Sequence, residues 1–483
     1  MIAKHNLVRI EPYLYEIPPH LYPNMRVPAR IYADDNYLEA ALNDRSVEQL
    51  INTTTLPGVI KYALVMPDIH EGYGFPIGGV AATLLPEGVI SPGGVGYDIN
   101  CGVHLLTSTL EAEAVRPHLP DLMTALFKGV PSGVGGEGVI SASGTELNKL
   151  LEEGVGWAVR KGYASEEDRE HTEDGGCMRG GNAGALSKHA LERGRGQVGS
   201  LGSGNHFLEI DEIVEIYDPQ VADAFGLAEG RVCVWIHCGS RGLGHQVCTD
   251  AVRAMQQSTT KYGFHLPDRE LACAPFDSPE GQQYFQAMCC AANYAWVNRQ
   301  LIAERVRRIL EQVLPKEVGN RHLRLLYDVC HNIAKVEHHE VNGKILELCV
   351  HRKGATRAFG PNRQDVPRDY RAIGQPVLIP GSMGTGSYVL VGTDKAMRDT
   401  FGSTCHGAGR VWSRGEAKRR IRGEKLRADL EGADILVRAG SMSGLAEEAP
   451  EAYKDVDRVV DIVHRAGIAR KVARTRPLGV IKG

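Results

Sequence analysis

The chain has 483 residues, a formal net charge of −4, and ordinary shares of hydrophobic (43%) and charged (24%) residues. This balance excludes a polycation that binds nucleic acid over its whole surface, so any such site must be local. The 56 glycines exceed the roughly 7% of an average protein, but they follow no G-X-Y period, which excludes a collagen.

The chain is predicted to form one large domain. At roughly 150 residues per domain its length would allow about three, yet it contains no long linker, low-complexity tract or fixed repeat. We expect an α+β fold over residues 1–483, with mixed β-sheets flanked by helices. Residues 111–195 are more polar and interrupted by glycines, which favours an insertion or a lid packed on the main body.

The intracellular location is inferred from what the sequence lacks. No run approaches the roughly 18 apolar residues of a membrane span, and the first residues lack a basic-then-apolar signal. The 11 cysteines form no regular framework, as expected for reduced thiols, some of which could bind metal. We therefore expect a cytoplasmic protein with no membrane partner.

Short apolar runs bounded by Gly or Pro predict buried strands at 59–66, 232–236, 323–330, 345–350, 376–379 and 388–391. Apolar residues spaced by three and four predict a helix over 297–314, where Pro315 stops it. The same spacing recurs near the C-terminus, at Val456, Val459, Val460 and Val463.

Five residues along the chain could form a metal centre. Asp98 and Cys101 lie three apart in the glycine-rich segment 91–103, and His206 emerges from the loop GSLGSGNHFLEI. His237 and His331 each end an apolar run. Taken singly, each is more often a helix cap or a core side chain. Together they predict a Zn²⁺ site or a two-metal centre bridged by the thiolate, and the residue types do not select the metal.

A second group of segments suggests nucleotide chemistry. In STCHGAGR, His406 stands among small residues, so a nucleotide could reach its ring, which can act as a nucleophile toward phosphorus. The segment IPGSMGTGSYVLVG offers hydroxyls and loop amides to a phosphate but lacks the Lys of a Walker A motif. The alternatives are a glycine turn with a hydrogen-bonding His and an ordinary hairpin.

Basic residues are concentrated between 410 and 427, where eight Lys or Arg stand against two Glu. Such a density suits RNA phosphates, although a solvated helix face is the common explanation of a charged run. Further basic residues could extend this path: Arg352, Lys353, Arg357, Arg470, Lys471, Arg474 and Arg476.

Taken together, these segments resemble the RtcB family of RNA ligases. The resemblance is carried by MPDIHEGYGFPIGGV (66–80), GGVGYDINCGV (93–103), GSLGSGNHFLEI, HCGSRGLGH, DVCHNIAK, HRKGATRAF, PGSMGTGSYVLVG, STCHGAGR and PLGVIKG (477–483). It runs from residue 66 to the end and is weakest over the first fifty residues and 111–195.

The resemblance implies roles for single residues. It places two Mn²⁺ ions on Asp98, Cys101, His206, His237 and His331, and GMP on His406 as the catalytic residue. Contacts with GTP would come from Asn205, His206, Phe207, Leu208, Glu209, His331, Asn332, Pro380, Gly381, Ser382, Met383, Ser387, His406, Gly407, Ala408, Gly409, Tyr453 and Lys482. Tyr453 would pack on guanine, Glu209 would accept from its N1 and exocyclic amine, and Lys482 would lie near O6.

The implied reaction joins RNA ends that carry a 2′,3′-cyclic phosphate or a 3′-phosphate to 5′-hydroxyl ends, in tRNA splicing or RNA repair. Its partners would be RNA and GTP, with an accessory activating protein as a further candidate, and we expect a monomer. Two other functions compete with this one: a metal-dependent phosphodiesterase or phosphatase for RNA ends, and a non-catalytic RNA-binding module.

Overall fold

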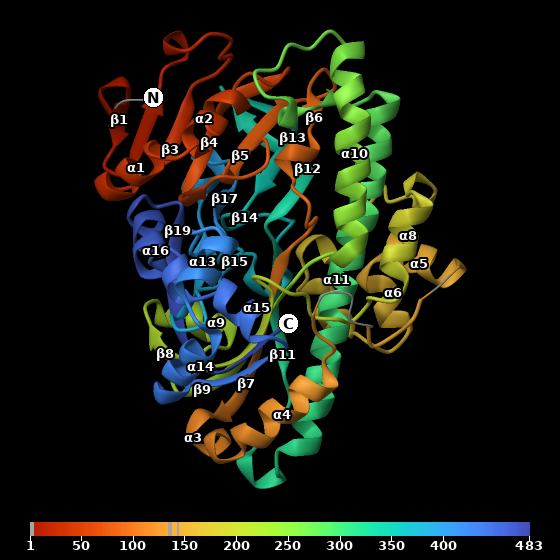
Figure 1. Cartoon of the computed structure of the whole chain (residues 1–483), viewed down its shortest axis with the longest axis vertical. Helices are drawn as coiled ribbons and strands as arrows, with labels where there is room; N and C mark the ends of the chain where they lie inside the picture. The colour runs from red at the N-terminus through yellow and green to blue at the C-terminus, as the bar shows by residue number, and fades with distance from the viewer. Residues whose placement is uncertain (1–3, 134–137, 143) are drawn as a thin grey trace.

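Two large β-sheets and a pair of long helices make up most of the molecule (Figure 1). The structure is a computed structural model that describes residues 4–133, 138–142 and 144–483. Strands and helices are mixed along the chain and pack into one compact unit, which confirms the predicted α+β class.

The first sheet has seven strands in the order β1-β2-β3-β4-β5-β13-β12. Their bounds are β1 Val8–Glu11, β2 Leu14–Ile17, β3 Ala29–Tyr32, β4 Val59–His70, β5 Ile77–Leu84, β13 Lys344–Lys353 and β12 Asn332–Val341. The pair β3–β4 is parallel and the other pairs are antiparallel.

The second sheet follows the order β11-β7-β9-β8-β19-β16-β15, with β18 added in parallel to β19. Its strands are β11 Arg324–Cys330, β7 Gly102–Glu111, β9 Arg231–Cys238, β8 Phe207–Ile216, β19 Ala469–Lys482, β16 Ser387–Gly392, β15 Pro376–Ile379 and β18 Leu436–Ala439. Two short ladders join β6 (Val89–Ile90) to β10 (Ala274–Pro275), and β14 (Ala355–Arg357) to β17 (Ser403–Cys405).

The α-helices surround these sheets. They are α1 Asp35–Leu42, α2 Ser46–Thr53, α3 Ala112–Val115, α4 Leu119–Gly129, α5 Thr145–Glu153, α6 Val155–Arg160, α7 Glu166–Glu170, α8 Lys188–Arg195, α9 Pro219–Phe225, α10 Arg241–Lys261, α11 Pro279–Val313, α12 Asp394–Asp399, α13 Arg414–Arg420, α14 Gly423–Gly432, α15 Met442–Glu447 and α16 Val456–Arg465. Within the described ranges, no helix is long and apolar enough to cross a membrane.

The six predicted strands are present, inside β4, β9, β11, β13, β15 and β16. The predicted helix 297–314 is the C-terminal half of α11, which runs with α10 along the long axis of the molecule (Figure 1). Helix α11 begins at Pro279. Ser278 is its N-cap, and the Ser278 hydroxyl accepts a hydrogen bond from the Gly281 N–H. The helix ends before Pro315. Its central residues are buried on all sides, so the 3.6-residue periodicity is visible only in the half near the surface.

The helices α5, α6 and α8 of the segment 111–195 pack against α10 and α11 and share a hydrophobic cluster with α11. Leu150, Trp157 and Ala190 contribute apolar side chains to this cluster. The role of the segment as an insertion or lid stays a prediction.

The register of the second sheet gathers several chain segments at one end. Gly102, the first residue of β7, pairs with Cys238 at the end of β9 and with Cys330 at the end of β11. Phe207, the first residue of β8, pairs with His237. The residues just before β7 and β8 and just after β11 therefore meet at this end, although they lie far apart in sequence.

Candidate metal and nucleotide site

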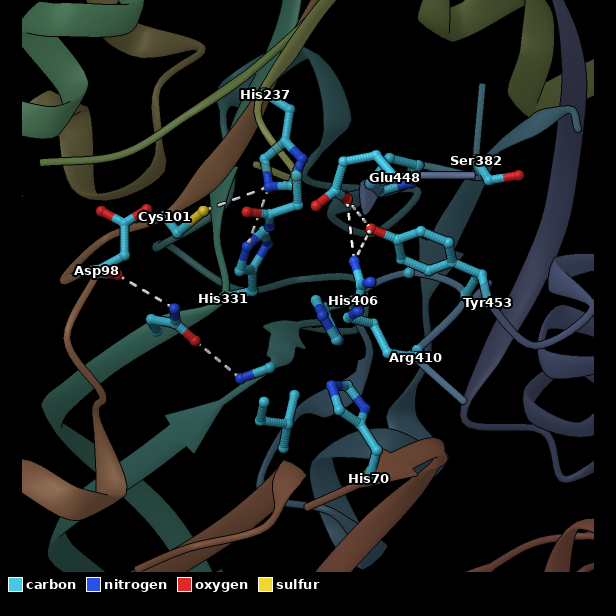
Figure 2. A pocket seen from close by; sticks show the side chains of 18 of the residues that line it. His70, Asp98, Cys101, His237, His331, Ser382, His406, Arg410, Glu448 and Tyr453 are labelled. Atoms are coloured by element: carbon cyan, nitrogen blue, oxygen red, sulfur yellow. Dashed lines mark hydrogen bonds and ion pairs between the residues drawn. The ribbon is translucent and has the colours of Figure 1, made fainter. Parts of the chain in front are cut away.

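A cavity of about 380 Å³ opens at this end of the second sheet. Figure 2 shows Asp98 and Cys101 on one side of it and Ser382 and Tyr453 on the other, with His331 and His406 between them. Its volume is in the range of small-molecule binding sites. The cavity therefore brings the metal candidates and the nucleotide candidates into one space.

Two triads of donor atoms share the Cys101 thiol: Cys101 with His237 and His331, and Cys101 with Asp98 and His206. Within each triad the donor atoms lie within 4.8 Å of one another. The Cys101 Sγ lies 3.4 Å from His206 Nε2 and 3.3 Å from His237 Nε2. The Nε2 atoms of His237 and His331 are 3.4 Å apart, so the imidazoles present their nitrogens to a common centre.

The protonation of these groups suits metal binding. Burial lowers the pKa of His237 and of His331, and the neighbouring imidazoles lower both further, so both rings are neutral and could bind a metal. Burial alone would raise the pKa of Asp98, but the charge and hydrogen bond of His206 outweigh it and lower the pKa to about 2. Burial raises the pKa of the Cys101 thiol to about 12, and a cation would displace that proton.

One carboxylate, one thiol and three imidazoles fit a divalent transition metal. The surrounding groups support this use, because the Cys238 Sγ lies 3.7 Å from His206 Nδ1, so it can hold the ring edge that faces away from Asp98. The Ser240 N–H donates to Asp98 Oδ1 at 3.1 Å. Such contacts orient ligands before a metal binds.

A buried arginine lies behind the two triads. Arg299 of α11 donates from Nε and Nη2 to the carboxylate of Asp328 at 2.8 and 2.7 Å. Its Nη1 donates to the backbone oxygens of Asn100 and Cys238, each at 2.8 Å. These two residues adjoin the ligands Cys101 and His237, and Asp328 precedes His331 by three residues on β11. One guanidinium thus ties together the three chain segments that carry the ligands.

His406 follows β17 and is held by a carboxylate. Its ring Nδ1 lies 2.6 Å from Asp68 Oδ2, which also accepts from the His406 backbone N–H at 3.0 Å. Burial would raise the pKa of Asp68, but its interactions with His406 lower it overall. With Nδ1 directed at Asp68, the Nε2 edge of the ring is free for the cavity. Gly409 is required beside this pair, because its φ is +76° and a Cβ there would lie 2.3 Å from the backbone oxygen of Asp68.

The opposite wall carries a polar group of three side chains. Arg410 Nη1 donates to the Tyr453 hydroxyl at 2.9 Å and to Glu448 Oε2 at 3.1 Å, and the tyrosine hydroxyl also donates to that carboxylate. Burial would raise the pKa of Glu448, but the charges of Lys482 and Arg410 lower it. This wall therefore presents an ionised carboxylate and an aromatic ring to a ligand.

The structure brings most of the predicted residues to this cavity. Those that line it are Asp98, Cys101, Asn205, Phe207, His237, His331, Asn332, Pro380, Gly381, Ser382, Met383, His406, Gly407, Ala408, Gly409, Tyr453 and Lys482. His206 lies beside it, with Nε2 2.8 Å from Asp98 Oδ2.

Besides His206, three predicted residues lie outside the lining: Leu208, Glu209 and Ser387. Leu208 faces the other side of β8 and packs in a hydrophobic cluster, because successive strand residues alternate between faces. Glu209 is buried, and burial together with Asp211 raises its pKa, against the charge of Lys482. Ser387 supports the loop instead, since its hydroxyl accepts from the Gly381 N–H at 3.0 Å.

Sequence reasoning missed Asp68 and Glu448, of which the second lines the cavity, and it singled out Arg414, which also lines the cavity, only as part of the basic run. Asp68 had a usable signal, because an acidic residue followed by His70 ends a buried apolar run in MPDIH. Glu448 had none, since a lone carboxylate just after a short helix is usually a solvated side chain.

The expected basic path is wrong at two positions, Arg352 and Arg357. Arg352, Lys353 and Arg357 are at most 5% exposed. The guanidinium of Arg352 donates to both oxygens of Glu337 at 2.6 and 2.9 Å, and Arg357 pairs with Asp174 at 2.7 Å. Both arginines serve as internal counter-charges and cannot contact RNA, whereas Lys353 lines the cavity, where its Nζ donates to the Phe75 backbone oxygen at 3.1 Å. In the run 410–427, Lys418, Arg419 and Arg422 are exposed, although Lys418 pairs with Glu447 at 2.7 Å.

Comparison with known proteins gives one consistent match. A family model described as tRNA-splicing ligase RtcB matches residues 49–483. A tRNA-splicing ligase RtcB from Archaeoglobus fulgidus is 56% identical over 477 residues, which are 99% of each chain. The protein of that name from Thermococcus kodakarensis is 55% identical with the same coverage. An RNA-splicing ligase RtcB from Mycobacterium bovis is 52% identical over 90% of this chain and all of its own.

The arginine behind the ligands generates a prediction. Replacing Arg299→Met removes the charged partner of the buried Asp328 and leaves it only the hydrogen bond with His104, so the free energy of unfolding should fall by about 3–5 kcal/mol. The amount of Mn²⁺ bound per chain after dialysis should also fall, because the three segments that carry the candidate ligands lose their hydrogen bonds to Arg299. Urea denaturation and elemental analysis measure the two effects.

The matched control is Arg324→Met. Arg324 also pairs with two carboxylates, Glu167 and Asp369, but its side chain is 34% exposed, so the expected loss is at most about 1 kcal/mol. Equal stability and equal metal content in the two variants would contradict the role given to Arg299.

Proposed function

The chain belongs to the RtcB family of tRNA-splicing ligases, and we propose on this basis that it joins RNA ends with GTP and manganese through a guanylylated His406. As a family member it is an RNA ligase of tRNA processing. The observation that carries the proposal is the pairing of Asp68 with His406 Nδ1 at 2.6 Å, which leaves Nε2 free as a nucleophile beside the metal candidates.

In the first nucleotide step His406 Nε2 attacks the α-phosphorus of GTP, an N–P bond forms, and the bond to pyrophosphate breaks. The imidazole loses its lone pair to phosphorus and becomes positively charged. The buried Asp68 carboxylate stabilises that charge, because a fixed opposite charge in a site shielded from water is worth far more than in bulk water. The Asp68 contact also keeps the ring in the tautomer that presents Nε2.

Asp98, Cys101, His206, His237 and His331 would hold the metal ions. When bound, divalent ions neutralise charge on phosphorus and lower the pKa of water or a hydroxyl. All five donors come from one end of the second sheet and the loops beside it, so they would stand next to the reacting phosphorus and not at a distance from it.

The RNA steps use the same cavity. Water opens the 2′,3′-cyclic phosphate to a 3′-phosphate, which then attacks the phosphorus of the His406 adduct and takes the GMP as the N–P bond breaks. The 5′-hydroxyl of the second RNA attacks the 3′-phosphate, a 3′,5′-phosphodiester forms, and GMP leaves. His406 returns to its neutral state at the end of the second step.

The wall opposite the metal candidates supports a guanine subsite. Tyr453 offers a ring held by Arg410 and Glu448, and Lys482 Nζ lies 5.3 Å from the ring centre of Phe207. A carboxylate that accepts from N1 and the exocyclic amine distinguishes guanine from adenine. Glu448 is our candidate for this role, because it lines the cavity and is ionised, whereas Glu209, which the sequence suggested for it, lies outside the lining. We further propose a cytoplasmic monomer that acts on RNA, with an accessory activating protein as an additional partner.

The covalent step can be tested directly. Wild-type protein incubated with Mn²⁺ and GTP labelled at the α-phosphate should retain acid-labile label, and His406→Ala should retain none. A phosphodiesterase or an RNA-binding module needs no covalent nucleotide, so label on neither protein would refute the ligase mechanism. Label on both would move the nucleophile to another residue.

Asp68 provides a second test. In Asp68→Asn the charge is lost while the size is kept, so the rate of guanylylation should fall by about 10²–10⁴-fold. Bound Mn²⁺ should not change, because Asp68 is not in either donor triad. The control is Asp434→Asn, an exposed position with φ +62° that Asn adopts readily. A normal guanylylation rate in Asp68→Asn would rule out charge stabilisation by this carboxylate.

The exposed basic residues near α13 provide a third test. In the double variant Arg419→Glu/Arg422→Glu, RNA affinity should fall about tenfold, and the slope of log K against log salt should lose about one to two units. Guanylylation with GTP alone should continue. Lys316→Glu/Lys344→Glu changes two exposed lysines elsewhere by the same charge. If both double variants bind RNA alike, the basic run is only a solvated surface.

A further inference from the structure

We propose that Tyr73, Tyr97 and His245, which we call the aromatic row, form a stacking subsite for the terminal base of the RNA strand that carries the 5′-hydroxyl. The inference rests on the proposed ligase function and adds the place of its second RNA substrate. None of the three side chains is a metal donor or part of the guanine wall described above.

The three rings form a continuous series. The ring centres of Tyr73 and Tyr97 are 5.6 Å apart and nearly edge to face, and those of Tyr97 and His245 are 4.9 Å apart with planes 31° from parallel. Tyr73 and Tyr97 line the cavity. The tyrosines are half-buried and His245, in the first turns of α10, is exposed. The row therefore leads from the cavity to the surface.

The chemistry of the row suits a single-stranded nucleic acid. Bases that are not paired stack on aromatic side chains, and cationic groups nearby hold the phosphates. Arg193 of α8 is exposed and lies at the outer end of the row, with Nη1 3.5 Å from His245 Nδ1. The aromatic row begins at the cavity and ends beside Arg193. This arrangement suits an RNA strand whose terminal nucleotide lies in the cavity and whose next phosphates lie near the arginine.

The position of the row selects which strand it would hold. Tyr97 directly precedes Asp98, so the row starts on the metal-candidate side of the cavity, and Figure 2 places Asp98 opposite Tyr453. In the joining step the attacking and leaving oxygens lie in line on opposite sides of phosphorus. If GMP leaves toward Tyr453, the 5′-hydroxyl must arrive from the side of Asp98 and Tyr97.

The test uses a short RNA with a free 5′-hydroxyl and 2-aminopurine as its 5′-terminal base, whose fluorescence falls when it stacks. Wild type and Tyr97→Phe should quench the probe. In Tyr97→Ala and Tyr73→Ala the quenching should be lost and the Kd of this RNA should rise about tenfold, as expected when one base loses its stacking partner. Bound Mn²⁺ is measured in each variant, because a loss of metal would show that the substitution has disturbed Asp98. If Tyr97→Ala has lost metal, the result with Tyr73→Ala decides whether the aromatic row binds the base.

Three results would overturn the subsite. The first is no quenching by wild type, and the second is quenching by both alanine variants that equals that of wild type. The third is quenching only of a probe at the last nucleotide of a 3′-phosphate RNA. Labelling of His406 by GTP is followed separately in the absence of RNA. Absence of label with intact quenching would reject the ligase mechanism and keep an RNA-end subsite. Normal label without quenching would reject the aromatic row alone.

Discussion

The site depends on the burial of a charged pair, Arg299 with Asp328, behind the metal candidates. Two charges removed from water are costly unless each is fully hydrogen-bonded. Here every nitrogen of the guanidinium has an acceptor, and the acceptors belong to the segments that carry Cys101, His237 and His331. The hydrogen bonds that the buried Arg299 guanidinium needs therefore also hold these three segments, and the candidate ligands that they carry, at fixed distances from one another.

The same principle recurs around His406. Arg352 is fully buried, and besides Glu337 it donates to the Ser403 hydroxyl at 2.8 Å and to the Phe401 oxygen. Ser403 begins the short strand that leads to His406, and Asp68 then holds the histidine ring from β4. Arg352, which the sequence suggested as part of an RNA-binding path, thus acts inside the protein, where it holds the segment that leads to His406. The exposed basic residues near α13, together with Arg470 and Arg476 on β19, remain able to contact phosphates.

The cavity has two chemically different sides, and in the proposed reaction the nucleotide and the metal ions would bind on opposite sides of it. Thiol, carboxylate and imidazole donors occupy one side, and Tyr453, Glu448, Arg410 and Lys482 occupy the other. His406 lies between them, with its ring centre 5.0 Å from that of His331. A nucleotide bound on the second side would place its α-phosphorus near both the histidine and the donors, while the first side stays open toward the aromatic row.

The sequence by itself predicted six of the strands, since Val, Ile and Leu runs bounded by Gly or Pro depend on local composition, and it indicated which residues could bind metal or nucleotide. It could not determine that α11 extends back to Pro279, because a helix buried on all sides loses the periodicity that marks one face. Tertiary structure alone decided that Asp68 supports His406, that Arg352 and Arg357 are internal, and that Leu208 and Glu209 lie off the cavity. Each of these depends on contacts between segments that are distant in the chain. Such contacts cannot be predicted from the residues that surround a side chain in the sequence.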